Sequence, residues 1–156
     1  MTAYRDLYQQ AQADSEGFWL DAAKSIDWVT PPTRALDASN PPFSRWFPDG
    51  ELNTCYNAVD RHVAAGRGDQ KAIIYDSPIT DSASTMSFSE LQTATALFAG
   101  MLARLGINKG DRVIIYMPMI PQSLVAMLGC ARLGAVHSVV FGAFSPGSLR
   151  DRINDS

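Results

Sequence analysis

The sequence predicts an α/β protein that contains part of a doubly wound parallel sheet. Residues 112–117 (RVIIYM) and 136–141 (VHSVVF) are short, apolar and rich in β-branched side chains, as buried parallel strands are. Residues 122–133, between them, are long enough for a helix and apolar nearly all round. Because short turns join these segments, their order indicates a right-handed βαβ unit.

Prolines and glycines set the ends of these elements. Pro118 ends the first strand because it has no N–H to donate, and Pro121 suits the first turn of the helix. Gly134 ends that helix. After a turn at residues 142–144, residues 145–146 (Ser-Pro) cap and begin another helix. The predicted order is therefore βαβα.

A helix, a hairpin and a long helix precede this unit. Asn53 caps the first helix, and Gly66 and Gly68 stop it. Residues 71–77 (KAIIYDS) and 85–88 (TMSF) are predicted as the two strands of the hairpin. Residues 87–90 (SFSE) have the spacing of a capping box, which opens the long helix. The residues on its predicted apolar face are Leu91, Ala94, Thr95, Phe98, Leu102 and Leu105.

The N-terminal part of the chain is irregular. Helices are predicted over residues 2–12 and 15–25, the second capped by Asp14 or Ser15. Residues 27–53 hold five of the nine prolines and four large aromatic residues, so we expect an extended arm there. Because a free linker would not carry such rings, we expect them to fix the arm along a larger surface.

The composition indicates a globular chain with a substantial core. Its 156 residues are 46% hydrophobic and 19% charged, with a formal net charge of -3. No basic excess or basic stripe is present, so we expect no nucleic-acid partner. The N-terminus lacks a signal-peptide pattern, and no uninterrupted apolar run reaches the roughly 20 residues of a membrane span. Cys55 and Cys130 lack CxxC spacing, which favours reduced core thiols. We therefore expect a cytoplasmic protein without a membrane partner.

The predicted sheet is incomplete. A βαβ unit buries its faces only beside further strands and a second helix layer, and residues 122–133 carry more apolar surface than this chain can cover. The chain is therefore expected to be a piece of a larger domain. Two regions are predicted: helices and the extended arm over residues 1–66, and the truncated start of the sheet domain over residues 67–156.

Motifs for phosphate binding and nucleophilic catalysis are absent from the sequence. The glycines never form G-x-G-x-x-G between a strand and a helix, which disfavours a nucleotide-binding Rossmann protein. Neither a P-loop nor a G-x-S-x-G nucleophile elbow occurs. The two histidines, His62 and His137, are expected to be structural, His137 in a buried strand. Asp60 is expected to be a lone surface carboxylate at a helix end. The sequence thus predicts no catalytic residue and no metal site.

One turn has features that suit a ligand. Ligands of open α/β sheets bind outside the carboxyl ends of the strands, where this chain has FGAFSP (residues 141–146). Phe141 or Phe144 offers a flat face there. Gly142 and Ala143 would let a ligand approach the backbone closely, and the next helix directs its N–H groups to the same place. An ordinary tight βα turn accounts for the same residues, and both alternatives stay open at this point.

Several stretches match a known family. They are DWVTPP, LDASNPPFSRWFPDGEL, LNTCYNAVDRHV and the whole of residues 86–156 (MSFSELQ to RINDS). Through them, nearly the full chain resembles the adenylate-forming acyl-CoA synthetases, in the branch of the acetyl- and propionyl-CoA synthetases. The segment SNPPFSRWF is more similar to propionyl-CoA than to acetyl-CoA synthetases.

The resemblance implies an AMP-forming ligase of propionate metabolism that turns acetate or propionate and ATP into an acyl-adenylate and transfers the acyl group to coenzyme A. ATP, coenzyme A and Mg are the implied cofactors of the full-length enzyme. By resemblance, Phe141, Gly142 and Ala143 lie beside the coenzyme A nucleotide, and Ala143 replaces a usual second glycine. The family's phosphate-binding loop, acidic Mg ligands and C-terminal lysine are not among these residues. We therefore expect this chain alone to be inactive and to bind none of these cofactors tightly.

Two functions follow from these observations. The first is an N-terminal fragment of a short-chain acyl-CoA synthetase, whose partners are a short-chain carboxylic acid and the remainder of the synthetase. The alternative is a free-standing, non-catalytic interaction module derived from such an enzyme, which pairs through its uncovered apolar face. An in-frame continuation beyond codon 156 with a Ser/Thr/Gly-rich loop favours the first, and a stop codon there with independent solubility favours the second.

Overall fold

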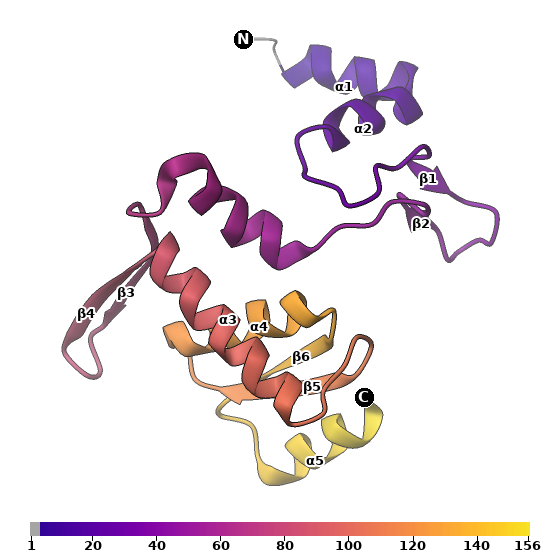
Figure 1. Ribbon diagram of the computed structural model, residues 1–156. Helices are drawn as coiled ribbons and strands as arrows, with labels where there is room; N and C mark the ends of the chain where they lie inside the picture. The colour runs from indigo at the N-terminus through magenta and orange to yellow at the C-terminus, as the bar shows by residue number, and fades with distance from the viewer. Residues whose placement is uncertain (1–3) are drawn as a thin grey trace. The chain divides into compact units, whose positions relative to one another are not determined.

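The computed structural model describes residues 4–156 (Figure 1). The chain forms two compact units, one ending at Leu52 and the other running from Asn53 to Ser156. The domain division expected between residues 66 and 67 stays a prediction, because compactness alone does not define the domains of a family.

Two short helices begin the first unit. They are α1 (Tyr4–Ala13) and α2 (Ser15–Ala23). The Asp14 carboxylate accepts a hydrogen bond from the Gly17 N–H at 2.9 Å, so Asp14 is the N-cap of α2, as expected. The first two residues of the predicted helix over 2–12 lie outside the described residues.

The arm after α2 is mostly extended, with one two-residue ladder between β1 (Leu36–Asp37) and β2 (Arg45–Trp46). Aromatic contacts hold it within the unit. Trp28 packs edge-on against Phe47 at 5.5 Å between ring centroids, and Trp46 packs against Trp19 of α2 at 5.4 Å. Phe43 is 74% exposed and lies outside this cluster. Its expected role in fixing the arm is therefore wrong within this unit.

The second unit opens with a helix whose turns are partly wider than α-helical. Asn53 is its cap, since its side-chain oxygen accepts the Tyr56 N–H at 3.0 Å. Two π-helical segments follow, η1 (Tyr56–Asp60) and η2 (Val63–Arg67). Gly66 ends the regular backbone with φ of 77°, which glycine adopts at low cost. The cap and the stop were predicted, whereas the π-turns were not.

The hairpin and the long helix follow as predicted in order. Strands β3 (Lys71–Ser77) and β4 (Ser82–Ser87) pair antiparallel, so the second strand begins three residues before the predicted TMSF segment. Helix α3 (Phe88–Arg104) carries the predicted capping box of Ser87 and Glu90. On its predicted apolar face, Leu105 is wrong, because this residue caps the helix end and is 72% exposed.

The C-terminal elements form the predicted βαβα order. They are β5 (Arg112–Met117), α4 (Pro121–Leu133), β6 (Val136–Phe141) and α5 (Pro146–Asp155). The two strands pair parallel and in unbroken register from Arg112 opposite Val136 to Met117 opposite Phe141. The α/β fold class is confirmed, and the sheet has two strands in the part of the chain that the structure describes.

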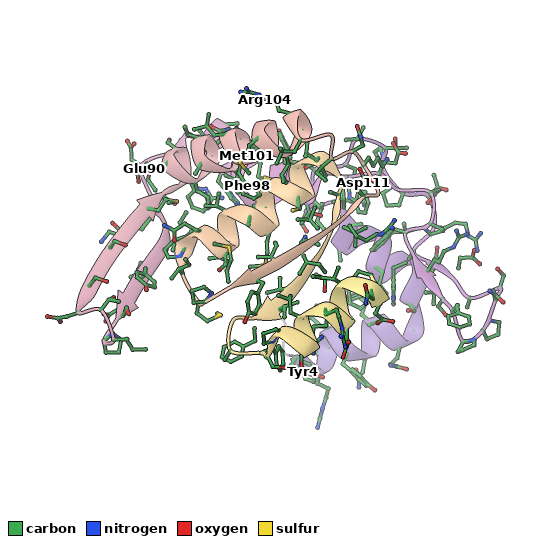
Figure 2. The ribbon with its side chains drawn as sticks, turned by 90° about the horizontal axis from the view of Figure 1, so that it is seen from below. Tyr4, Glu90, Phe98, Met101, Arg104 and Asp111 are labelled. Carbon is green, nitrogen blue, oxygen red and sulfur yellow. The ribbon has the colours of Figure 1, made fainter. Side chains whose placement is uncertain are left out.

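Helices lie on both faces of this sheet. Residues of β5 alternate between the two faces. Val113, Ile115 and Met117 pack into the core with α3 and α4, where Ile115 is 4% exposed. Ile114 instead lines a groove together with Ile153 of α5. Figure 2 shows α5 on one side of β5 and β6, and α4 and α3 on the other.

The sheet is covered unevenly on both faces. On the face of α5, Val140 is 1% exposed but Val136 is 56% exposed, and no residue of α5 is buried. On the face of α4, Val139 pairs with the buried Ile115 but is 51% exposed. Complete burial of β5 and β6 on both faces was expected and is therefore wrong for the described chain. Leu124 of α4 is also 42% exposed. The exposed apolar positions agree with an incomplete synthetase sheet.

A polar network ties the first helix of this unit to α3 and α4. One guanidinium nitrogen of Arg132 donates to both Asp60 carboxylate oxygens, at 2.9 and 2.8 Å, and Gln92 donates to the same carboxylate at 2.7 Å. The Asp60 side chain is 13% exposed. The expectation of a lone surface carboxylate is therefore wrong, since Arg132 reaches Asp60 from 72 residues along the chain.

Replacing Arg132 by Met should destabilise the chain, because the half-buried Asp60 carboxylate would lose its charged partner. We expect a loss of about 2 kcal/mol in the free energy of unfolding, somewhat below the range for fully buried pairs. Urea denaturation measures it. Arg150→Met is the control, because its ion pair with Asp151 is 74% and 70% exposed and should contribute less than about 0.5 kcal/mol. Equal losses in the two variants would contradict the role of the network.

The Asp37 carboxyl should titrate far below its usual range. Hydrogen bonds from the Ser39 side chain and backbone, and from Arg45, lower its pKa from 3.8 to about 2. Because the folded pKa is depressed, this stabilisation is present above pH 3.8 and is lost as the pH falls towards 2. An NMR titration of the Asp37 side chain measures the pKa. Ser39→Ala should raise it more than Arg45→Gln does, and the reverse order would contradict this assignment.

Candidate functional site

The turn between β6 and α5 lies at the edge of the sheet where both parallel strands end. Met117, the last residue of β5, is opposite Phe141, the last residue of β6. Residues 141–144 are all exposed. This is the edge where ligands of open α/β sheets bind, and the turn that the sequence singled out lies on it.

Hydrogen bonds give the turn a defined shape. The Phe144 N–H donates to the Phe141 carbonyl at 3.1 Å, which closes the turn. Ser145 then caps α5, its hydroxyl accepting the Ser148 N–H at 3.3 Å. Helix α5 therefore begins directly after the turn, with its partly positive end there.

Two aromatic rings stand at the turn. Phe141 is 59% exposed and Phe144 is 38% exposed, and they meet edge-to-face at 6.2 Å between centroids. The Arg152 guanidinium carbon lies 4.8 Å from the centroid of the Phe144 ring. The turn thus combines an open flat ring, a nearby cation and a helix N-terminus, which together suit the base and the phosphates of a nucleotide.

Tyr116 supports the turn from the neighbouring strand. Its hydroxyl donates to the Phe144 carbonyl at 2.8 Å. Neither Tyr116 nor Arg152 was predicted from the sequence. A signal for Tyr116 was available, because a strand alternates faces and Ile115 is in the core, so Tyr116 must point to the face of α5.

Gly142 has a structural reason to be glycine. A Cβ at this position would lie 3.2 Å from the backbone carbonyl of Met117 and from the Pro118 nitrogen. The space that the missing side chain leaves is therefore taken by the end of β5. Gly142 and Ala143 are both exposed, and the close approach of a ligand to their backbone stays a prediction.

The two histidines, His62 and His137, were expected to be structural. His62 contacts Arg67 and packs against the Phe88 ring at 4.9 Å. Burial and the charges of Arg67 and Arg61 lower the pKa of His62. His137 was expected in a buried strand but is exposed, so that expectation is wrong.

The two cysteines are core thiols in the described structure. Cys55 and Cys130 are both free and fully buried, and burial raises the pKa of each. Between residues 4 and 156, no group of three or more His, Cys, Asp or Glu side chains is placed to hold a metal ion. No helix in the same range is long and apolar enough to cross a membrane.

Replacing Gly142 by Ala should destabilise the chain, because the new methyl group meets backbone atoms that cannot rotate away. We expect a loss of about 1–2 kcal/mol in the free energy of unfolding, measured by urea denaturation. Gly147→Ala is the matched control, because the nearest atom to its Cβ would be the Ser145 hydroxyl at 3.9 Å. This exposed helical position should gain up to about 1 kcal/mol. A loss of stability in the control alone would contradict this account.

Comparison with known proteins identifies two matching regions. Residues 4–58 match the family model described as the acetyl-coenzyme A synthetase N-terminus, and residues 60–156 match that of the AMP-binding enzymes. The chain is 51% identical over 151 residues to an acetyl-coenzyme A synthetase of Streptomyces avermitilis, covering 97% of this chain and 23% of the relative.

Two further relatives match over similar lengths. An acetyl-coenzyme A synthetase of Thiobacillus denitrificans is 53% identical over 157 residues, covering all of this chain and 24% of the relative. The mitochondrial acyl-CoA synthetase short-chain family member 3 of Rattus norvegicus is 49% identical, covering 97% of this chain and 22% of the relative. The chain thus spans about a quarter of the length of these relatives. Because the AMP-binding match takes in more than half of its residues, the chain belongs to the AMP-binding enzyme family, in its acetyl- and propionyl-CoA synthetase branch.

Proposed function

We propose that this chain is the N-terminal part of a short-chain acyl-CoA synthetase, an AMP-forming ligase that joins acetate or propionate to coenzyme A. The observation that carries this proposal is the match over the whole chain to relatives named acetyl-coenzyme A synthetase. Acyl-CoA synthesis through an acyl-adenylate requires ATP and Mg as well. The groups for ATP activation are assigned to the remainder of the synthetase, which is the main partner of this chain.

The role proposed for this chain is to form one wall of the coenzyme A site. Phe141, Gly142 and Ala143 lie on an exposed turn at the ligand-binding edge of the sheet. The open Phe141 ring offers a stacking surface for the adenine base. The start of α5 and the Arg152 side chain supply positive charge for phosphate. Coenzyme A supplies the thiol that accepts the acyl group, and the residues of the turn bind and orient its nucleotide end.

The substrate is a short-chain acid. The SNPPFSRWF segment favours propionate, whereas the relatives named above include two acetyl-coenzyme A synthetases, so both acids belong in the assay. A cytoplasmic location is proposed from the two free thiols. One of the relatives is named mitochondrial, so the compartment also needs a direct test.

A chimera tests the proposed function. This chain would replace the matching N-terminal region of the Thiobacillus denitrificans acetyl-coenzyme A synthetase, to which it is 53% identical. We expect the chimera to release AMP from ATP over many turnovers only when both a short-chain acid and coenzyme A are present. The truncated partner enzyme and the 156-residue chain are the controls, and neither should form AMP.

Two outcomes would overturn this assignment. One is a chimera that melts cooperatively and has native-like circular dichroism but forms no AMP with acetate or propionate. The other is ATP consumption by the 156-residue chain alone, which would mean that the activating groups lie within these residues. In the assay, the ratio of kcat/KM for propionate to that for acetate also measures the acid preference.

A further inference from the structure

Hydrogen bonds from β5 reach both ends of the α5 segment. The residues of β5 on its outer face are Arg112, Ile114 and Tyr116, which follow one another at a spacing of two. The Tyr116 hydroxyl reaches the Phe144 carbonyl at 2.8 Å, just before α5 begins. At the other end of β5, the Arg112 side chain donates to the Ser156 carbonyl at 3.2 Å.

Apolar burial on this face is limited to part of β6. Val140, the register partner of Tyr116, is 1% exposed, but no residue of α5 is buried and Ile153, which lines a groove with Ile114, is 53% exposed. The turn before α5 is exposed as well. Its position therefore depends on directed contacts in addition to this burial, and the one from Tyr116 is the contact nearest to the three residues assigned to coenzyme A.

The hydrogen bonds around Phe144 form a short chain. Tyr116 donates to the carbonyl of Phe144, and the N–H of Phe144 donates to the carbonyl of Phe141 at 3.1 Å. Tyr116 is also the register partner of Val140, the residue before Phe141. Strand β5 therefore holds the turn at both ends: it pairs with β6 before the turn, and the Tyr116 hydroxyl bonds the Phe144 carbonyl after it.

We infer that Tyr116 is a positioning residue for coenzyme A, acting through the backbone of the turn without touching the reacting atoms. The inference rests on the proposed function, which places the nucleotide end of coenzyme A at Phe141–Ala143. A hydroxyl that fixes the Phe144 carbonyl sets the angle of α5 and the orientation of the Phe141 ring. Without it the turn samples other positions, and only a fraction of molecules presents the binding geometry.

The same geometry separates this role from general stability. The core side chains of β5 lie on its other face, whereas Tyr116 is 40% exposed. Tyr116→Phe removes one oxygen and keeps the ring. Tyr56→Phe is the matched control, since Tyr56 is 44% exposed and belongs to η1, a different element.

The test uses the chimeric synthetase described above. In Tyr116→Phe we expect the KM for coenzyme A to rise about fivefold, equivalent to about 1 kcal/mol. The KM values for ATP and for the acid should not change. The adenylation half-reaction, measured as pyrophosphate exchange without coenzyme A, should also keep its rate. Tyr56→Phe should behave as the parent chimera in every assay.

A second measurement uses the 156-residue chain itself. Amide hydrogen exchange at Phe144 and Ser148 should be faster in Tyr116→Phe, while exchange in α4 stays the same. A general loss of stability would accelerate both regions, so this readout distinguishes a local from a global effect.

Four outcomes decide the inference. An unchanged KM for coenzyme A overturns it, and so does a parallel loss of pyrophosphate exchange, which would indicate general damage. Phe141→Ala in the same chimera separates the two proposals. If Phe141→Ala raises the KM for coenzyme A and Tyr116→Phe does not, only the role of Tyr116 is refuted. If neither variant changes it, the coenzyme A site assigned to this turn is refuted as well.

Discussion

The parallel pairing of β5 and β6 is the constraint from which the other features of the second unit follow. Parallel strands cannot be joined by a tight turn, so α4 must cross from the end of one to the start of the other. The pairing also brings both carboxyl ends to one edge, with Met117 opposite Phe141. Gly142 can then fit against the end of β5, where a Cβ would lie 3.2 Å from backbone atoms.

The alternation along β5 divides its side chains between two tasks. On one face, Ile115 is buried with Leu102 of α3 and Cys130 of α4, and burial of this apolar surface stabilises the unit. On the other face, Tyr116 and Arg112 hold the ends of the α5 segment by hydrogen bonds. Core and candidate site are therefore built from adjacent residues of one strand. A substitution at Tyr116 can change the turn with little effect on the core.

The helix before the hairpin is fixed by a different kind of contact. Asp60, Arg132 and Gln92 come from three helices and meet at one partly buried carboxylate. Asn53, which caps the first of these helices, also donates to the Arg132 carbonyl at the end of α4, at 3.1 Å. These polar contacts join the three helices, while the adjoining cluster of Cys55, Val59 and Leu91 buries apolar surface.

Local chemistry in the sequence determined most of the elements, whereas the family followed from the resemblance of whole stretches. The Ser87 capping box, Pro121 at a helix start and the left-handed Gly134 act within a few residues, so their effects can be predicted from the sequence. The position of the turn at Phe141–Phe144 follows in the same way from strand and helix signals. These local signals also placed both parallel strands within their observed bounds.

Contacts between distant residues could only be found in the tertiary structure. The ion pair of Asp60 with Arg132 joins positions 72 apart, and nothing in the local sequence around Asp60 indicates it. Tyr116 acts on Phe144 across 28 residues, which requires the strand register and the direction of α5 to be known. The exposure of His137 likewise depends on what covers β6. Sequence determines what each short segment can form, whereas the pairing of segments decides which side chains meet, because that choice depends on the packing of the whole unit.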